Sequence, residues 1–194
     1  MNKRSGIESR NRIVAAAIDV FSKRGYGEAS IREIAASAGI SIGSVYLYFR
    51  NKEELYKGIL RDKRREMADM TTAVVEKAQS ATEALSDFLK LYLDNALKHR
   101  EFIILHIRDL GFSFDINEKR QFFLSQRKMV ENILERGISS GEFRKCNARD
   151  TAKLIIGSLR GIVLSAALNE ETIVTSNSLR EFLLDGLLKR EKRS

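Results

Sequence analysis

Apolar residues recur at helical spacing along almost the whole of this chain, and nothing in the sequence interrupts that pattern as a proline would. None of the 194 residues is proline, which helix interiors exclude because it removes a backbone donor and clashes with the preceding turn. Near the start, Ile13, Ala16, Ala17, Val20 and Phe21 already form one apolar stripe. The sequence therefore predicts an all-α fold.

Beyond residue 80 the same periodicity predicts further helices, separated at Gly111, Gly141 and Asn169. The expected ranges are 81–98, 101–110, 117–140, 148–168 and 175–190. The apolar run at 102–107 could pass as a short strand, but its helical surroundings favour a helix.

The first third of the chain predicts a helix-turn-helix. One helix is expected to stop at Gly25, and Ser30 and Glu33 have capping-box spacing at the start of the next. Gly39 ends that second helix, and Ser41 opens a short third one that is expected to reach Tyr48. The inward-facing residues of these two helices are expected to be Ile31, Ile34, Ala35, Ala38, Val45 and Phe49. A short projecting helix of this kind fits the major groove of B-DNA.

A fourth helix is expected to begin after Asn51, again with a glutamate, Glu54, three residues on, and to run toward residue 78. The positive charge of the chain is concentrated in this region. Residues 1–65 hold 14 Lys and Arg against 7 Asp and Glu, a net charge of +7, out of +8 for the whole chain. This asymmetry suggests a head that binds a polyanion, although a solvated basic face without a partner would look the same.

Residues 10–60 resemble the DNA-binding domain of the TetR family. The matching residues are Ala17, Phe21, Gly25, Tyr26, Ile34, Ala35, Ala38, Gly39, Ile40, Ser41, Tyr46, Tyr48, Phe49, Lys52, Glu53, Glu54 and Leu55. The resemblance implies an N-terminal three-helix DNA-binding domain over residues 1–50 and a helical ligand-binding and dimerisation domain over 51–194. The helix at about 52–78 would connect the two. It also implies a homodimeric repressor that binds a pseudo-palindromic operator and is released by a small hydrophobic effector.

The resemblance further implies which residues contact DNA. They are Ser30, Arg32, Ser41, Ile42, Gly43, Ser44, Tyr46, Tyr48 and Lys52. Arg32 would grip guanine with two hydrogen bonds, and Lys52 would contact a phosphate. Taken singly, Arg32 could be a solvated helix residue and Ile42 could shield the turn. Tyr46 and Tyr48 are two residues apart and point in different directions, so one of them could serve packing.

The resemblance also places a dimer interface and an effector pocket in the body. The dimer residues are expected to be Leu154, Ser158, Gly161, Ile162, Leu179, Phe182 and Leu183, on the last two helices. The pocket residues are expected to be Phe88, Leu91, Tyr92, Phe102, Leu105 and Phe122, each of which could instead be plain core. The segment from Gly137 to Phe143, followed by an Ile-Gly-x-x-x-Gly helix, resembles members that sense hydrophobic or acyl ligands.

Other classes of protein have weaker support. His99 and His106 could bind a metal with Glu101 or Asp109, but no clustered ligand motif accompanies them, and no catalytic fingerprint appears. Cys146 is the single cysteine, and its basic neighbours could favour a redox role. A non-specific DNA-organising protein is the remaining alternative. We expect no enzyme activity, cofactor, metal or membrane span, and a cytoplasmic protein.

Overall fold

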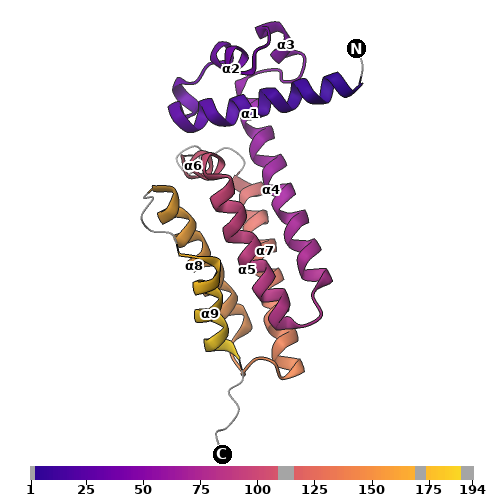
Figure 1. Cartoon of the computed structure of the whole chain (residues 1–194), viewed down its shortest axis with the longest axis vertical. Coiled ribbons are helices and arrows are strands. Elements are labelled where there is room, and N and C mark those ends of the chain that lie inside the picture. Colours follow the sequence, from indigo (N-terminus) through magenta and orange to yellow (C-terminus); the bar gives the residue numbers. More distant parts are fainter. Residues whose placement is uncertain (1–2, 109–115, 169–173, 189–194) are drawn as a thin grey trace, which may run out of the picture. The chain divides into compact units, whose positions relative to one another are not determined.

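The computed structural model describes residues 3–108, 116–168 and 174–188, and every regular element in these ranges is a helix (Figure 1). The helices are α1 (Lys3–Glu28), α2 (Ile31–Ala38), α3 (Ile42–Tyr46), α4 (Lys52–Lys77), α5 (Ala81–Lys98), α6 (Arg100–Arg108), α7 (Ile116–Ser140), α8 (Ala148–Leu168) and α9 (Ser176–Leu187). The all-α prediction is confirmed, and residues 102–107 are helical.

The predicted boundaries agree closely with these elements. The ranges 81–98 and 148–168 are those of α5 and α8. The third helix is shorter than expected, because α3 ends at Tyr46 and not at Tyr48. Gly141 has a φ of +80° and directly follows α7, as predicted. The expected breaks at Gly111 and Asn169, and the expected helix ends at 110 and 190, lie outside the described residues.

Packing divides the chain into two compact units. One consists of Met1–Arg64 with Glu101–Ile116, and the other of Arg65–Arg100 with Asn117–Ser194. We call them the head and the body. The head is larger than the expected domain of residues 1–50, because it includes the first half of α4 and nearly all of α6.

The core of the head is built from the apolar faces of α1, α2, α3, α4 and α6. Ile13, Ala17 and Phe21 of α1 are buried as the stripe predicted, whereas Val20 is only partly buried. The ring of Tyr56 on α4 meets the ring of Phe21 edge-on, with 5.1 Å between their centroids. The predicted inward face of α2 and α3 is buried as well: Ile31, Ile34, Ala35, Ala38, Val45 and Phe49.

The core of the body lies among α5, α7, α8 and α9, with α8 and α9 packed beside α5 (Figure 1). A turn after α7 fastens the ends of these helices together. Glu142 accepts hydrogen bonds from the backbone nitrogens of Ala81 (3.1 Å) and Thr82 (2.9 Å) at the start of α5. Phe143 is buried against Gly137, and the backbone nitrogen of Arg144 donates to the carbonyl of Leu187 at 2.9 Å.

Among the described residues, no helix is both long enough and apolar enough to cross a membrane.

Candidate nucleic-acid interface

The turn between α2 and α3 has the geometry that the sequence predicted. Gly39 adopts the left-handed conformation, with φ 63° and ψ 41°, and its N–H points back to the carbonyls of Ala35 and Ala36. The guanidinium of Arg12 on α1 donates to the carbonyls of Ala38 and Gly39. A cation at the C-terminal end of a helix complements the helix dipole, so Arg12 holds α2 against α1.

Both predicted serine caps are confirmed. The hydroxyl of Ser30 accepts from the backbone nitrogen of Glu33 at 3.2 Å, and the Glu33 carboxylate accepts from the backbone nitrogen of Ser30 at 3.0 Å. The Ser30 hydroxyl also donates to that carboxylate, and these bonds lower the pKa of Glu33. Ser41 accepts from the backbone nitrogen of Ser44 at 3.1 Å. A phosphate contact through the Ser30 hydroxyl would therefore have to replace its bond to Glu33.

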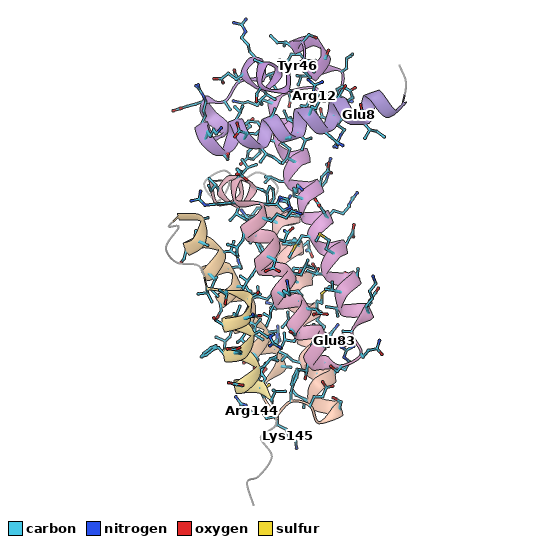
Figure 2. All side chains as sticks on the ribbon, in the orientation of Figure 1. Glu8, Arg12, Tyr46, Glu83, Arg144 and Lys145 are labelled. Atoms are coloured by element: carbon cyan, nitrogen blue, oxygen red, sulfur yellow. The ribbon has the colours of Figure 1, made fainter. Side chains whose placement is uncertain are left out.

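The other candidates for DNA contact differ in exposure. Arg32, Ile42 and Gly43 are exposed, and Ser44 is half-buried. Tyr46 is 52% exposed, and Figure 2 labels it on the head, as it does Arg12. Tyr48 is half-buried and packs against the core of the head. Of the two tyrosines, Tyr46 is thus the one whose side chain is available to a partner.

The ammonium group of Lys52 is bonded within the head. Its ammonium nitrogen donates to three carbonyl oxygens, those of Tyr26 (2.7 Å), Gly27 (3.2 Å) and Ala29 (2.9 Å), and lies 4.5 Å from the centre of the Tyr26 ring. An ammonium group has three donors, so all of them are occupied within the head. Lys52 therefore fastens the start of α4 to the C-terminal end of α1 and to Ala29 directly after it. The expected phosphate contact by this ammonium stays a prediction, and it would have to replace one of these bonds.

Two exposed residues beside α3 were missed by the sequence analysis. Leu47 is 74% exposed although it is apolar. Its position could have been inferred, since a residue two places after the buried Val45 faces roughly the opposite side of a helix. Arg50 is exposed just before α4, and its backbone nitrogen donates to Glu54 at 2.7 Å while Asn51 caps the helix. It lies two residues before Lys52, the first residue of α4.

The expected pocket residues separate into two groups. Phe102 packs against the core of the head and Leu105 is buried in it, and the Tyr56 hydroxyl lies 3.5 Å from the Leu105 carbonyl oxygen. Their assignment to a pocket in the body is therefore corrected, because α6 turns its apolar face toward the head. Phe88 is fully buried in the body core and Tyr92 packs against that core. Leu91 and Phe122 are half-buried.

Polar groups also enter the body near Tyr92. Burial raises the pKa of Tyr92 to about 12, although the positive charge of Arg160 acts in the opposite direction. The guanidinium carbon of Arg160 lies 3.9 Å from the centre of the Phe123 ring. Three and four residues after Phe123 on α7, the Oε1 of the almost fully buried Gln126 and the Nε of Arg127 have no hydrogen-bond partner among the described residues. Buried groups of this kind are rare enough to require an explanation.

The expected dimer residues lie mostly on exposed surfaces of α8 and α9. Leu154 is 71% and Phe182 77% exposed, and Ser158 and Gly161 are exposed as well. A β-carbon added at Gly161 would have nothing within 4 Å. The expected place of Leu179 in the dimer interface is corrected, because its side chain is buried in the core of its own protomer. The last two expected residues, Ile162 and Leu183, are half-buried and pack against that core.

The described residues give no support to the alternative hypotheses of a metal site or a redox role. Within that part of the chain, no group of three or more His, Cys, Asp or Glu side chains is arranged to hold a metal. The side chains of His106 and Asp109, on which the metal hypothesis depends, lie outside the described set. Cys146 is a half-buried free thiol that packs against the body core. In the sequence it directly follows Arg144 and Lys145, which are labelled in Figure 2.

Comparison with protein families covers most of the chain. A family model described as "Bacterial regulatory proteins, tetR family" matches residues 13–59. A second, described as "QacR-like protein, C-terminal region", matches residues 77–189. The first match contains α2, the turn and α3, and the second contains α5 to α9.

Individual relatives are regulators as well. The fatty acid metabolism regulator protein of Bacillus subtilis is 27% identical over 184 residues, which cover 90% of this chain and 93% of that protein. The HTH-type transcriptional repressor KstR2 of Mycolicibacterium smegmatis is 30% identical over 141 residues, 70% of this chain and 67% of that protein. The crystal structure of FadR from Bacillus subtilis in complex with stearoyl-CoA has a similar fold, with a TM-score of 0.76 at 24% identity, over 91% of this chain and 98% of that one.

Proposed function

Since this chain belongs to the TetR family and is a DNA-binding transcriptional regulator, we propose that it is a repressor that binds a pseudo-palindromic operator and leaves it when an effector binds. Regulators of this family bind operator DNA as dimers and bind small-molecule ligands. The observation that carries the proposal is the head itself, where a capped α2, a left-handed turn and an exposed α3 present Arg32 and Tyr46 to a partner.

In the proposed sequence-specific binding, different residues of the head contact the bases and the phosphates. Arg32 reads a base, and the surface of α3 from Ile42 to Tyr46 enters the major groove. Arg50, which is exposed just before α4, attracts a phosphate, with Lys52 holding that helix end in position. Residues 1–50 supply the DNA-binding domain, and residues 51–194 supply effector binding and dimerisation.

The body supports an effector with a long apolar part and a polar group. Phe88 and Tyr92 belong to an extensive apolar core to which α7 contributes, and Gln126 and Arg127 on α7 carry buried polar atoms without a described hydrogen-bond partner. Two similar regulators are a fatty acid metabolism regulator and a FadR that was crystallised with stearoyl-CoA. We therefore propose a fatty acyl thioester as the effector class. Its preference for one conformation of the regulator sets the upper limit on how far it can weaken DNA binding.

The first experiment is selection of bound fragments from genomic and random DNA at about 0.15 M salt, a concentration that suppresses purely electrostatic binding. We expect an enriched pseudo-palindrome whose half-sites lie about 10 base pairs, or a multiple of that, apart. Binding without enrichment would instead indicate a non-specific DNA-organising protein. The matched control is the same protein challenged with excess random DNA, which should not displace it from the selected site.

The effector is tested on the complex with the selected operator. Acyl-CoA of increasing chain length should release the DNA, whereas free coenzyme A at the same concentration should not. Release by coenzyme A alone, or the absence of release at every chain length, would contradict the effector class but leave the operator result intact.

A further inference from the structure

Leu47 lies directly after α3, beside two exposed candidates for DNA contact, Ile42 and Tyr46. Ile42 is 38% exposed, Tyr46 52% and Leu47 74%. All three lie within or directly after α3, around the buried Val45. Large apolar side chains gain free energy when they leave water, so exposed ones on a DNA-binding helix favour contact with an apolar group of the DNA.

The same segment lacks the side chains that usually read bases by paired hydrogen bonds. Guanine is read by Arg or Lys, adenine by Asn or Gln, and cytosine by Asp or Glu. None of these residue types occurs between Ser41 and Phe49. The hydrogen-bonding side chains in this stretch are serine and tyrosine hydroxyls, and the Ser41 and Ser44 hydroxyls already bond to each other at 2.8 Å.

The major groove offers one apolar group for such side chains, the C5 methyl of thymine. We propose that Leu47, together with Ile42, reads thymine methyl groups in each half of the operator, and that Leu47 is a specificity-determining residue. This inference rests on the proposed function. The net charge of +7 in residues 1–65 favours DNA over a protein partner for these side chains.

The test removes the C5 methyl group of single thymines in the operator and leaves the rest of the DNA unchanged. Each thymine of the selected operator is replaced by deoxyuridine, in both symmetry-related positions, and the dissociation constant is measured at constant salt. Burial of one methyl-sized group corresponds to roughly a fourfold change in affinity, so we expect about a fifteenfold loss when both contacted thymines are replaced. Thymines outside the contacted positions should tolerate deoxyuridine.

A variant of Leu47 tests whether this residue is responsible for the discrimination between thymine and deoxyuridine. Leu47→Ala should bind the thymine operator more weakly and should no longer distinguish thymine from deoxyuridine at one position in each half-site. The matched control is Leu97→Ala, an exposed leucine on α5, which should keep the full discrimination. Because Leu47 is largely exposed, its truncation should leave the thermal unfolding of the free protein unchanged, and a circular dichroism melt verifies this.

The outcomes separate the inference from the function. An enriched palindrome whose thymines all tolerate deoxyuridine would overturn the inference alone. So would a Leu47→Ala variant that distinguishes thymine from deoxyuridine at every position where the wild type does. A protein that enriches no sequence would refute the proposed function and the inference together.

Discussion

At the scale of single residues, Lys52 shows how a cation beside a DNA-binding helix can serve the protein itself. Its three donors are occupied by carbonyl oxygens at the C-terminal end of α1 and at Ala29 directly after it. We expect Lys52→Met to lower the free energy of unfolding of the DNA-free protein by about 1–3 kcal/mol, because three carbonyls lose a charged partner. Urea denaturation measures this, with Lys77→Met, which replaces an exposed lysine at the last residue of α4, as the control.

The salt dependence of DNA binding distinguishes the two roles of Lys52. A phosphate contact would give the variant a salt slope that is smaller by about one unit, whereas a residue that only fastens α4 would leave the slope unchanged. An unchanged stability together with a reduced slope would support the phosphate contact that the sequence predicted.

Arg32 is exposed, so its proposed role is tested by measuring DNA binding and not the stability of the protein. Arg32→Ala should weaken binding by about 1–3 kcal/mol and relax the base preference at one operator position per half-site. Arg149→Ala, which removes an exposed arginine at the start of α8, should change neither. If Arg32→Ala weakened all sequences equally, Arg32 would be a phosphate contact and not a base reader.

Glu142 makes the stability of the body depend on pH. Burial alone would raise its pKa, but hydrogen bonds from Thr82, Ala81 and Ser140 outweigh burial and lower the pKa to about 2. A lowered pKa in the folded state stabilises the protein above the unfolded value of about 4.5, and that stability is lost as the pH falls toward 2. Glu142→Gln should therefore cost about 1–2 kcal/mol at pH 7, and the difference from the wild type should vanish between about pH 4.5 and 2. A difference that persists at pH 2 would contradict this account.

At the scale of elements, Gly137 sets how closely Phe143 can pack on α7. A β-carbon at Gly137 would lie 2.1 Å from Cδ2 of the Phe143 ring, and Phe143 is itself buried. We expect Gly137→Ala to lower the free energy of unfolding by about 1–3 kcal/mol, since the ring must leave its site. Gly58→Ala on α4 is the control, because its β-carbon would have only an ordinary contact of 3.8 Å. It should be neutral or stabilising by up to about 1 kcal/mol.

At the scale of the whole molecule, the exposed apolar face of α8 and α9 predicts that the protein is a dimer. Phe182→Glu places a charge where the partner would bury an aromatic ring, and it should give a monomer in light scattering and a large loss of operator affinity. Leu97→Glu on α5 is the matched control and should remain dimeric. Because Phe182 is 77% exposed, the variant protomer should keep its fold. A dimeric Phe182→Glu protein would exclude this face as the interface.

The sequence predicted what depends on neighbours along the chain. Helix caps such as the one between Ser30 and Glu33 join residues three positions apart, so their spacing can be recognised in the sequence. The partners of Lys52 lie 23 to 26 residues away, and no local pattern encodes them. On α9, Leu179 and Phe182 belong to one broad apolar stripe, and only the position of α5 decides that Leu179 is covered while Phe182 is not. The expected placement of Phe102 and Leu105 in the body failed for the same reason, because the packing of α6 in the head is not encoded by a local pattern.

Helix α4 begins in the head and ends in the body as one unbroken run of 26 residues. At about 1.5 Å per residue it is roughly 39 Å long. A pivot of only about 5° at one end of such a rigid rod displaces the other end by about 3 Å, more than the tolerance of a hydrogen bond to a base or a phosphate. A small tilt amplified along this lever arm would therefore be sufficient to separate the regulator from its operator.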